Sequence, residues 1–172
     1  MRRKMLVGLA LAVCGAVAFS ATSLASGKAA KPKWKTETLV VYNYAVFESS
    51  QIVDTDGSGT TGFENLTPAD MFIVSHEVLD KPKTEPGHKQ VGRTEGGVCM
   101  EVLDGAFACS GAFVFDEGRI FFSGIQGAEP VSRYAITGGT GAYRNVRGEM
   151  TVEVSADFTY ATNTVKLIGV ER

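Results

Sequence analysis

Short apolar runs separated by turn-forming residues make up most of the chain after residue 37. The runs are rich in Val, Ile, Phe, Tyr and Thr, clusters of Gly, Asp and Pro divide them, and helical periodicity is nearly absent. This pattern predicts eight β-strands, at residues 39–53, 71–79, 91–102, 106–115, 120–123, 131–137, 148–154 and 158–170. The pair Gly96-Gly97 predicts an interruption inside the third strand.

The short connections between these strands favour antiparallel pairing of sequence neighbours. The first and last strands are long and apolar, so pairing them with each other would remove both exposed edges of the sheet. We therefore expect an all-β fold, an eight-stranded antiparallel barrel of the calycin-like kind. A two-sheet sandwich is the alternative, which the strand pattern distinguishes only weakly.

The first 25 residues follow a different pattern, which is typical of an export signal. Residues 2–4 are basic, residues 5–19 are apolar, and small residues close the segment. The apolar run is shorter than the ~20 residues of a spanning helix, so a retained membrane anchor is the less favoured alternative. We predict a signal peptide at residues 1–25 and a secreted or periplasmic protein. A flexible basic leader at 26–37 and one β-domain at 38–172 follow.

The charge balance argues against nucleic acid and membrane partners. The whole chain has 17 Lys+Arg and 19 Asp+Glu, and three of the basic residues lie in the signal. Cleavage therefore leaves 14 basic against 19 acidic residues, a formal charge of −5. A mildly acidic domain has no general attraction for nucleic acid or anionic lipid, so we expect neither as a partner.

Two cysteines, Cys99 and Cys109, remain after cleavage. A hairpin closed over residues 103–105 places them directly opposite each other, and Gly105 suits the positive φ that ends such a loop. In an oxidising compartment an opposed pair is expected to form a disulfide. A pair of free thiols, with Cys99 in a functional pocket, is the alternative.

Motifs for hydrolytic, nucleotide-dependent or zinc chemistry are missing from the sequence. There is no Gly-x-Ser-x-Gly elbow and no phosphate loop, and His76 and His88 lack zinc-site spacing. We therefore expect no cofactor and no metal. Residues 54–60 partly resemble a calcium loop, but Asn65 stands where a bidentate Glu is needed, so an Asp/Gly-rich turn is the favoured interpretation.

The most specific stretch of the chain runs from Tyr134 to Gly148, with the sequence YAITGGTGAYRNVRG. A Gly-Gly-Thr-Gly turn is followed by an aromatic residue and by a glycine that leads into the next strand. This arrangement resembles the barrel signature of plant allene oxide cyclases and dirigent proteins, and dirigent proteins carry Arg at positions like Arg144 and Arg147. The resemblance implies a barrel that acts on a small molecule in its lumen and assembles as a dimer or trimer.

Other segments agree with the resemblance, and some positions depart from it. Residues 92–99 resemble the cyclase segment that ends in a pocket cysteine, and Phe47-Glu48 resembles a first-strand Tyr-Glu whose Glu lies in the cyclase pocket. In contrast, Cys99 has a predicted disulfide partner, His76 replaces an Asn of the cyclases, and Ala142 stands where dirigent proteins have an Asp.

Three residues are candidates for catalysis. Glu48 shares a strand face with Tyr42 and Tyr44, and if this face points inward, an acid beside tyrosines would suit general acid or base catalysis. Arg144 and Arg147 would steady a carboxylate or a developing anion. The alternatives are a Glu in water at the barrel rim and two arginines in surface or structural salt bridges.

Five residues are candidates for ligand contact, namely Tyr42, Tyr44, His76, Phe113 and Tyr134. We expect an exported barrel that binds a small apolar or aromatic molecule in its lumen. It would steer a cyclisation or coupling by holding the substrate in one shape. A non-catalytic carrier or an interaction module of the cell envelope is the alternative function.

Overall fold

The computed structural model describes residues 35–45, 50–62, 65–103, 105–127, 129–156 and 159–170 of the 172-residue chain. The predicted signal peptide, most of the leader and Glu48 lie outside the described residues, so these predictions stay untested. Within the described ranges, no helix is long and apolar enough to cross a membrane.

Ten β-strands and one short 3-10 helix form the described domain. The strands are β1 (Thr36–Ala45), β2 (Gln51–Val53), β3 (Met71–Val74), β4 (His76–Leu79), β5 (Gln90–Leu103), β6 (Ala106–Phe115), β7 (Gly118–Gln126), β8 (Val131–Gly139), β9 (Arg147–Val154) and β10 (Tyr160–Ile168), and the helix η3 is Gly141–Tyr143. Both β3 and β4 pair with β5, while β2 pairs with β3 and β1 pairs with β4. The ten strands therefore fill the eight positions that the sequence predicts.

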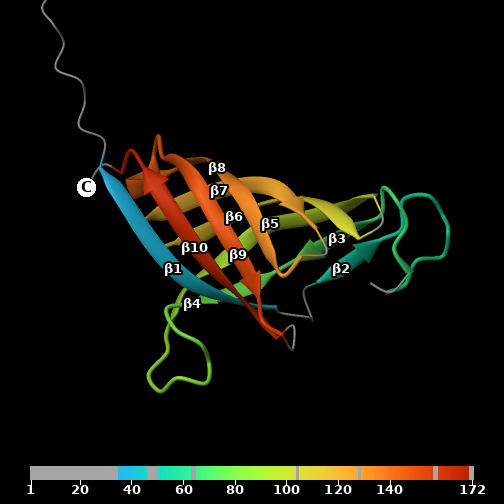
Figure 1. Ribbon diagram of the computed structural model, residues 1–172, viewed down its shortest axis with the longest axis horizontal. Helices are drawn as coiled ribbons and strands as arrows, with labels where there is room; N and C mark the ends of the chain where they lie inside the picture. Colours follow the sequence, from blue (N-terminus) through green and yellow to red (C-terminus); the bar gives the residue numbers. More distant parts are fainter. Residues whose placement is uncertain are drawn as a thin grey trace, which may run out of the picture. The chain divides into compact units, whose positions relative to one another are not determined.

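The sheet closes on itself, as Figure 1 shows. The strand order is β2-β3-β5-β4-β1-β10-β9-β8-β7-β6, and β6 pairs in addition with β5, so the order has no free end at β6. The first and last long strands form a seam in which Thr36 of β1 lies opposite Ile168 of β10 and Tyr44 opposite Tyr160. The prediction of an eight-stranded antiparallel barrel is confirmed, and the sandwich alternative is wrong because one continuous sheet joins all strands.

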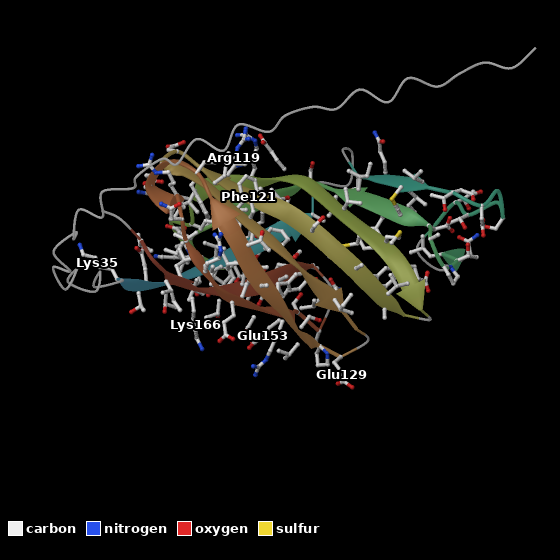
Figure 2. All side chains as sticks on the ribbon, turned by 90° about the horizontal axis from the view of Figure 1, so that it is seen from above. Lys35, Arg119, Phe121, Glu129, Glu153 and Lys166 are labelled. Carbon is white, nitrogen blue, oxygen red and sulfur yellow. A yellow bond between two sulfur atoms is a disulfide. The ribbon has the colours of Figure 1, made fainter. Side chains whose placement is uncertain are left out.

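Side chains alternate between the lumen and the outside because successive residues of a strand point to opposite faces. In β8, Ser132, Tyr134 and Ile136 are buried, whereas the residues between them are exposed. Lys166 of β10 and Glu153 of β9 are exposed and project outwards from the barrel (Figure 2). The lumen is therefore lined by every second residue of each strand.

A bulge in β5 interrupts its ladder with β6. The register shifts between Glu95 and Val98, and Gly96 has a φ of +59°, a conformation that favours glycine. A Cβ on Gly97 would lie 2.7 Å from the carbonyl oxygen of Val74 on β3, so this position has no room for a side chain. The interruption predicted from the Gly-Gly pair is confirmed.

One half of the lumen, which we call the packed half, is filled with side chains. It lies at the barrel end where β6 turns into β7 and where η3 links β8 to β9. Tyr143 and Val146, from this link, are 3% and 0% exposed, and the ring of Tyr143 lies 5.8 Å from that of Phe115. The same buried core contains Leu167 and Ile120. Side chains from the β8–β9 link therefore plug this end of the barrel.

The glycines of the signature stretch are required by close backbone approaches in the packed half. A Cβ on Gly139 would lie 2.3 Å from the carbonyl oxygen of Tyr143. Gly141 has a φ of +60°, and its Cβ would lie 2.2 Å from the carbonyl oxygen of Glu117. Gly148 has a φ of +154°, and a Cβ there would lie 1.9 Å from the carbonyl oxygen of Lys166. The stretch that carries the family resemblance therefore builds the plug.

Candidate functional site

The other half of the lumen, which we call the cavity half, is hollow. Its cavity has a volume of about 210 Å³ and reaches toward the end of the barrel where β7 and β9 finish. The residues that line it are Asn43, Ala45, Phe72, Val74, His76, Thr94, Gly97, Cys99, Cys109, Ser110, Phe122, Gln126, Tyr134, Met150, Val152, Val154, Thr159, Tyr160, Ala161 and Asn163.

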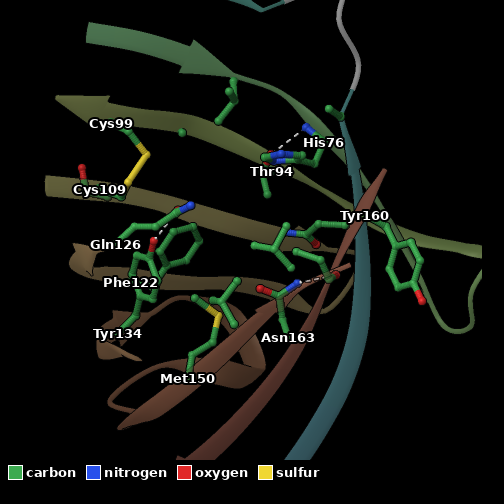
Figure 3. Close-up of a pocket in the computed structure, with 18 of the residues that line it drawn as sticks. His76, Thr94, Cys99, Cys109, Phe122, Gln126, Tyr134, Met150, Tyr160 and Asn163 are labelled. Carbon is green, nitrogen blue, oxygen red and sulfur yellow. Dashed lines mark hydrogen bonds between the residues drawn. A yellow bond between two sulfur atoms is a disulfide. The ribbon is translucent and has the colours of Figure 1, made fainter. Parts of the chain in front are cut away.

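One wall of the cavity is apolar and partly aromatic. Phe122 of β7, Tyr134 of β8 and Met150 of β9 lie on the same side of it, as Figure 3 shows. The rings of Phe122 and Tyr134 meet edge to face, with centroids 5.9 Å apart. This wall offers flat, polarisable surface to a ligand and few groups that need water.

A disulfide between Cys99 and Cys109 forms another part of the wall. The two residues lie directly opposite each other on β5 and β6, with Cα atoms 4.1 Å apart, and are 7% and 5% exposed. The predicted disulfide is confirmed, and the alternative of a pair of free thiols is wrong. Because both sulfurs are bonded, neither offers the free thiol that a cyclase-type pocket would use.

His76 and Thr94 form a polar pair on the cavity wall. The backbone N–H of His76 donates to the Thr94 hydroxyl oxygen at 2.8 Å, and the His76 ring Nδ1 lies 3.2 Å from the same oxygen. Burial lowers the pKa of His76 to about 4, because removing water disfavours the charged imidazolium. At neutral pH the cavity therefore holds an uncharged imidazole, which can form hydrogen bonds but is a weak base.

Tyr134 adds a second polar group that is satisfied within the protein. Its hydroxyl donates to the side-chain oxygen of Gln126 at 3.0 Å, and burial raises its pKa to about 12. The phenol is therefore neutral at physiological pH. His76 and Tyr134 both line the cavity, and their role in ligand contact stays a prediction.

Two buried asparagines complete the polar lining. The Asn163 side chain, 1% exposed, donates from its Nδ2 to the carbonyl oxygen of Ala161 at 3.1 Å. Asn43 is 8% exposed, and its Oδ1 has no hydrogen-bond partner. Among the described residues, this oxygen is the one buried side-chain polar atom without a partner.

The described lining carries no carboxylate, no arginine and no lysine. A charged ligand would therefore lack a counter-charge from these residues, and burying an unpaired charge is costly. Glu48, the predicted acid, lies outside the described residues, and its catalytic role stays a prediction.

Tyr42 and Tyr44 lie on the outer face of β1, because the lumen-facing residues of this strand are Val41, Asn43 and Ala45. The Tyr44 hydroxyl accepts a hydrogen bond from the backbone N–H of Lys83 at 2.8 Å, in the loop between β4 and β5. Neither tyrosine lines the cavity. The inward orientation on which their assignment depended is not the one that β1 adopts.

The predicted arginines are exposed and belong to the packed half. Arg144 follows η3, and Arg147 begins β9, where its Nη1 donates to the carbonyl oxygen of Val146 at 2.7 Å. Neither lines the cavity.

Phe113, 0% exposed, lies behind the cavity wall, with its ring centroid 5.0 Å from that of Phe122.

An acidic loop between β2 and β3 brings the carboxylates of Asp54, Asp56 and Asp70 within 4.8 Å of one another. The Thr60 hydroxyl donates to Asp70 at 2.6 Å, and this and further hydrogen bonds hold the pKa of Asp70 well below its usual range. Asp54 accepts the N–H of Gly57 at 2.7 Å. These bonds organise an Asp/Gly-rich turn, and the choice between a simple turn and a calcium loop stays a prediction.

A second hollow, of about 610 Å³, is a groove beside β1 and the start of β5 at the packed half. Lys89, Arg93, Asp116 and Glu117 line it, and all four are exposed. Leu39, Val41, Phe115 and Tyr143 also line it, so its wall mixes apolar side chains with these solvated charges. The wall of the cavity is mainly apolar, so the cavity is the better candidate site for an apolar ligand.

Asn43, Thr94, Phe122 and Asn163 are cavity residues that the sequence-based assignment missed. The detectable signal was polarity inside an apolar strand: Asn163 interrupts the last apolar run, and Asn43 shares a face with Val41. Choosing the face of Tyr42 as the inner one hid this signal.

Comparison with known proteins supports the fold. No family model and no curated protein matches the chain. Among solved structures, the pterocarpan synthase dirigent protein GePTS1 is similar at 22% identity and a TM-score of 0.66, over 81% of this chain and 87% of that protein. The chain therefore has the eight-stranded barrel fold of the dirigent type.

Two further solved structures have the same fold. A pyocyanin demethylase shares 29% identity with a TM-score of 0.56, over 76% of this chain and 99% of that protein. AbnU, an exo-specific intermolecular Diels-Alderase, shares 12% identity with a TM-score of 0.56, over 78% of this chain and 99% of that protein. The allene oxide cyclase part of the resemblance stays a prediction.

Proposed function

We propose that the cavity half binds one small, mainly apolar or aromatic molecule and steers its cyclisation or coupling. The observation that carries the proposal is the cavity of about 210 Å³ in the lumen, with its mainly apolar wall. Apolar walls with a few placed polar groups are typical of small-molecule sites. The volume is below the ~300–1,000 Å³ of drug-sized pockets, so we expect a compact ligand.

The described cavity residues contribute chiefly by positioning. Holding reacting groups in one arrangement removes translational and rotational freedom before the reaction, which can lower a barrier by several kcal/mol. The neutral His76 and Tyr134 orient polar atoms of the ligand by hydrogen bonds. We propose Glu48 as the acid or base, because Phe47-Glu48 resembles the first-strand Tyr-Glu of the cyclases.

The proteins of similar fold support a small-molecule role. The dirigent proteins are named as pterocarpan synthases, and other neighbours are named as Diels-Alderases and as a cyclase that catalyses a [4 + 2] cycloaddition. The pyocyanin demethylase shows by its name that this fold also serves a different reaction. We therefore propose steering of a cyclisation or coupling, without naming the product.

The direct test is product stereochemistry. The purified barrel is incubated with polyunsaturated epoxides and with phenolic radicals, and the products are separated by chiral chromatography. We expect a stereochemical excess that Phe122→Ala reduces, because Phe122 lines the cavity. Phe121→Ala is the matched control, because Phe121 is the neighbour of Phe122 in β7 and its side chain, 37% exposed, lies on the outer face. Racemic products and no binding of any panel member would contradict the proposal.

A non-catalytic carrier is the second candidate. The observation that favours it is chemical: the described lining has no charged group, and its cysteines are oxidised. Binding of panel members without any change in product would support the carrier over the steering role.

We also propose that the protein is exported, because the basic, apolar and small-residue segments at residues 1–25 have the order of a signal peptide. A disulfide between opposed cysteines agrees with an oxidising compartment.

Ile125 is 56% exposed and Met100 37% exposed on the outer face, which favours a homo-oligomer, as the resemblance implies. N-terminal sequencing of the mature protein and its mass in solution test these two points.

A further inference from the structure

His76 bonds to the protein through one ring nitrogen and leaves the other to the cavity. Its Nδ1 lies 3.2 Å from the Thr94 hydroxyl oxygen, and the residue lines the cavity (Figure 3). Among the described residues, the Asn43 Oδ1 is the one polar side-chain atom that is both sealed and without a partner. The Nε2 of His76 has no partner there either, so it is not sealed, and a molecule in the cavity can reach it.

Thr94 determines which ring nitrogen of His76 carries the proton. The Thr94 hydroxyl oxygen accepts the backbone N–H of His76 at 2.8 Å, and its own proton needs an acceptor because Thr94 is 4% exposed. Its remaining partner among the described residues is the Nδ1 of His76. Because the pKa of His76 is lowered to about 4, the ring carries a single N–H at neutral pH. With Nδ1 accepting, this N–H is the Nε2–H, and it is offered to the cavity.

The polar pair across the lumen also leaves an N–H group to a ligand. Tyr134 lies on β8, on the opposite side of the barrel from β4, since the order β4-β1-β10-β9-β8 spans half of the eight barrel positions. The Tyr134 hydroxyl donates to the Oε1 of Gln126, and the Nε2 of Gln126 has no partner among the described residues. The cavity therefore presents N–H donors from two sides.

Small residues leave room beside the His76 ring. Ala45 lies directly opposite His76 on β1, and Gly97 of the β5 bulge has no side chain, and both line the cavity. The aromatic wall of Phe122 and Tyr134 lies across this space. A ligand can therefore pack its apolar body against that wall and direct a polar atom towards the Nε2–H of His76.

We propose that the Nε2–H of His76 binds a carbonyl oxygen, so that the ligand is a compact, neutral ketone, enone or quinone with an apolar or aromatic body. This inference rests on the proposed binding function and names its ligand class. A carbonyl oxygen is a neutral acceptor with two lone pairs, which suits a wall that offers N–H donors. A carboxylate would also accept, but the described lining has no positive charge to pair with it.

The same hydrogen bond would assist the proposed cyclisation. A neutral imidazole that donates to a carbonyl oxygen polarises the C=O bond and stabilises negative charge that develops on this oxygen. When a conjugated carbon of the ligand forms a new bond, the electron pair comes from a second unsaturated bond of the same ligand. His76 donates a hydrogen bond and keeps its proton, so the step consumes no further reactant.

Nitrogen NMR of the nitrogen-15-labelled chain tests the tautomer. His88→Gln removes the other histidine, which is exposed and lies outside the cavity lining, so every imidazole signal then comes from His76. At neutral pH we expect a protonated Nε2 and an unprotonated Nδ1, and addition of the ketone 1-indanone should shift the Nε2 signal. A proton on Nδ1 would overturn the proposal.

A matched pair of probes tests the ligand class. 1-Indanone carries a carbonyl oxygen on a compact ring system, and in 1-methyleneindane a CH₂ group replaces that oxygen. Calorimetric titration of the purified chain gives the ratio of the two affinities. His76→Phe keeps a ring and removes the donor, so we expect the ratio to shift about tenfold against the ketone, the factor that one net hydrogen bond gives.

Two further variants isolate the donor. His88→Phe makes the same substitution at an exposed histidine outside the cavity lining, and we expect the wild-type ratio. His76→Gln keeps a side-chain N–H, so it should recover part of the ratio that His76→Phe loses. If His76→Phe does not fold, the tautomer measurement and His76→Gln still test the proposal, since loss of ketone preference in His76→Gln as large as one full hydrogen bond would contradict it.

The outcomes distinguish this inference from the function on which it rests. An unchanged ratio in a folded His76→Phe, or an equal shift in His88→Phe, would overturn carbonyl binding by His76 and leave the binding function standing. If the wild type binds neither probe, the proposed binding function falls, and this inference falls with it.

Discussion

The two halves of the barrel differ in what fills them. In the packed half, Tyr143 and Val146 plug the lumen, and close backbone contacts leave no room for side chains at the signature glycines. In the cavity half, the lumen keeps about 210 Å³ free, and a buried oxygen of Asn43 has no partner. The Gly-Gly-Thr-Gly part of the sequence therefore builds the scaffold, and the residues that line the cavity lie outside that turn, with Tyr134 at the start of the signature stretch.

This separation explains why the resemblance predicts the fold better than the activity. In this chain the Gly-Gly-Thr-Gly turn meets the packing needs of the plug, and these needs do not depend on what the cavity binds. Cavity residues are free to vary with the ligand, because single side chains on rigid strands can change without altering the backbone. Barrels of this fold with different named reactions agree with this view.

The largest effect is expected at Gly148 in the packed half. Gly148→Ala forces a Cβ to within 1.9 Å of the Lys166 carbonyl oxygen at a φ of +154°, so we expect a loss of roughly 4 kcal/mol or no soluble protein. Gly127→Ala is the control, since its Cβ would meet nothing closer than 4.0 Å. Thermal unfolding measures both. A Gly148→Ala variant as stable as wild type would contradict the structural role of the signature.

Removal of the disulfide should have the next largest effect. The bridge joins residues separated by 10 positions. Closing a loop of this length lowers the conformational entropy of the unfolded chain and so stabilises the folded protein by about 3 kcal/mol. We expect Cys99→Ser/Cys109→Ser to lower the free energy of unfolding by about this amount in urea titration. Treatment of the wild type with a reductant should give the same loss. An unchanged free energy of unfolding in the double variant would contradict a stabilising role of the bridge.

The fold could be predicted from the sequence because strand alternation and turn residues are local patterns. Strand alternation and turn residues located all eight barrel positions, and the predicted hairpin paired Cys99 with Cys109 correctly. Its loop is shorter than the predicted 103–105, because Leu103 belongs to β5 and pairs with Ala106 after a shift in register. Alternation alone does not say which face of a strand points inward. Both faces of β1 carry apolar or aromatic residues, so Tyr42 was assigned to the lumen, whereas the barrel closes with Asn43 inside.

Long-range packing explains the rest of what the sequence did not reveal. Which half of the lumen is filled depends on the β8–β9 link turning inward at Tyr143, and on small residues such as Ala161 leaving space at the other end. Neither property is visible in any single strand. An unpaired atom such as the Asn43 Oδ1 is defined only by the complete list of its neighbours.

Acid should expose a pH-dependent contribution of His76 in the cavity half, of a size at most similar to that of the disulfide. Its folded pKa of about 4 lies below the ordinary 6.5, so between these values the unfolded chain binds the proton more readily. The contribution of His76 to the free energy of unfolding is therefore fully present above about pH 6.5. It is lost as the pH drops towards 4, which lowers the free energy of unfolding by up to ~3 kcal/mol.

Comparison with His76→Gln isolates this contribution. Urea titrations from pH 7 to pH 4 should show a steeper loss of stability in the wild type than in the variant. His88→Gln controls for the removal of a histidine from an exposed position. Parallel pH profiles for wild type and His76→Gln would mean that the imidazole is hydrated and does not lie in a dry cavity.

Filling the cavity tests the central claim most directly. Val152 lines the cavity, whereas its neighbour Thr151, paired with the exposed Arg133, lies on the outer face. The measurement is the affinity for 1-indanone by calorimetry in Val152→Phe and Thr151→Phe, both checked for a wild-type melting transition. We predict at least tenfold weaker binding in Val152→Phe and a change of less than about twofold in Thr151→Phe, because only the first occupies the ligand's space. Equal affinities in both variants and the wild type would place binding elsewhere and contradict the account.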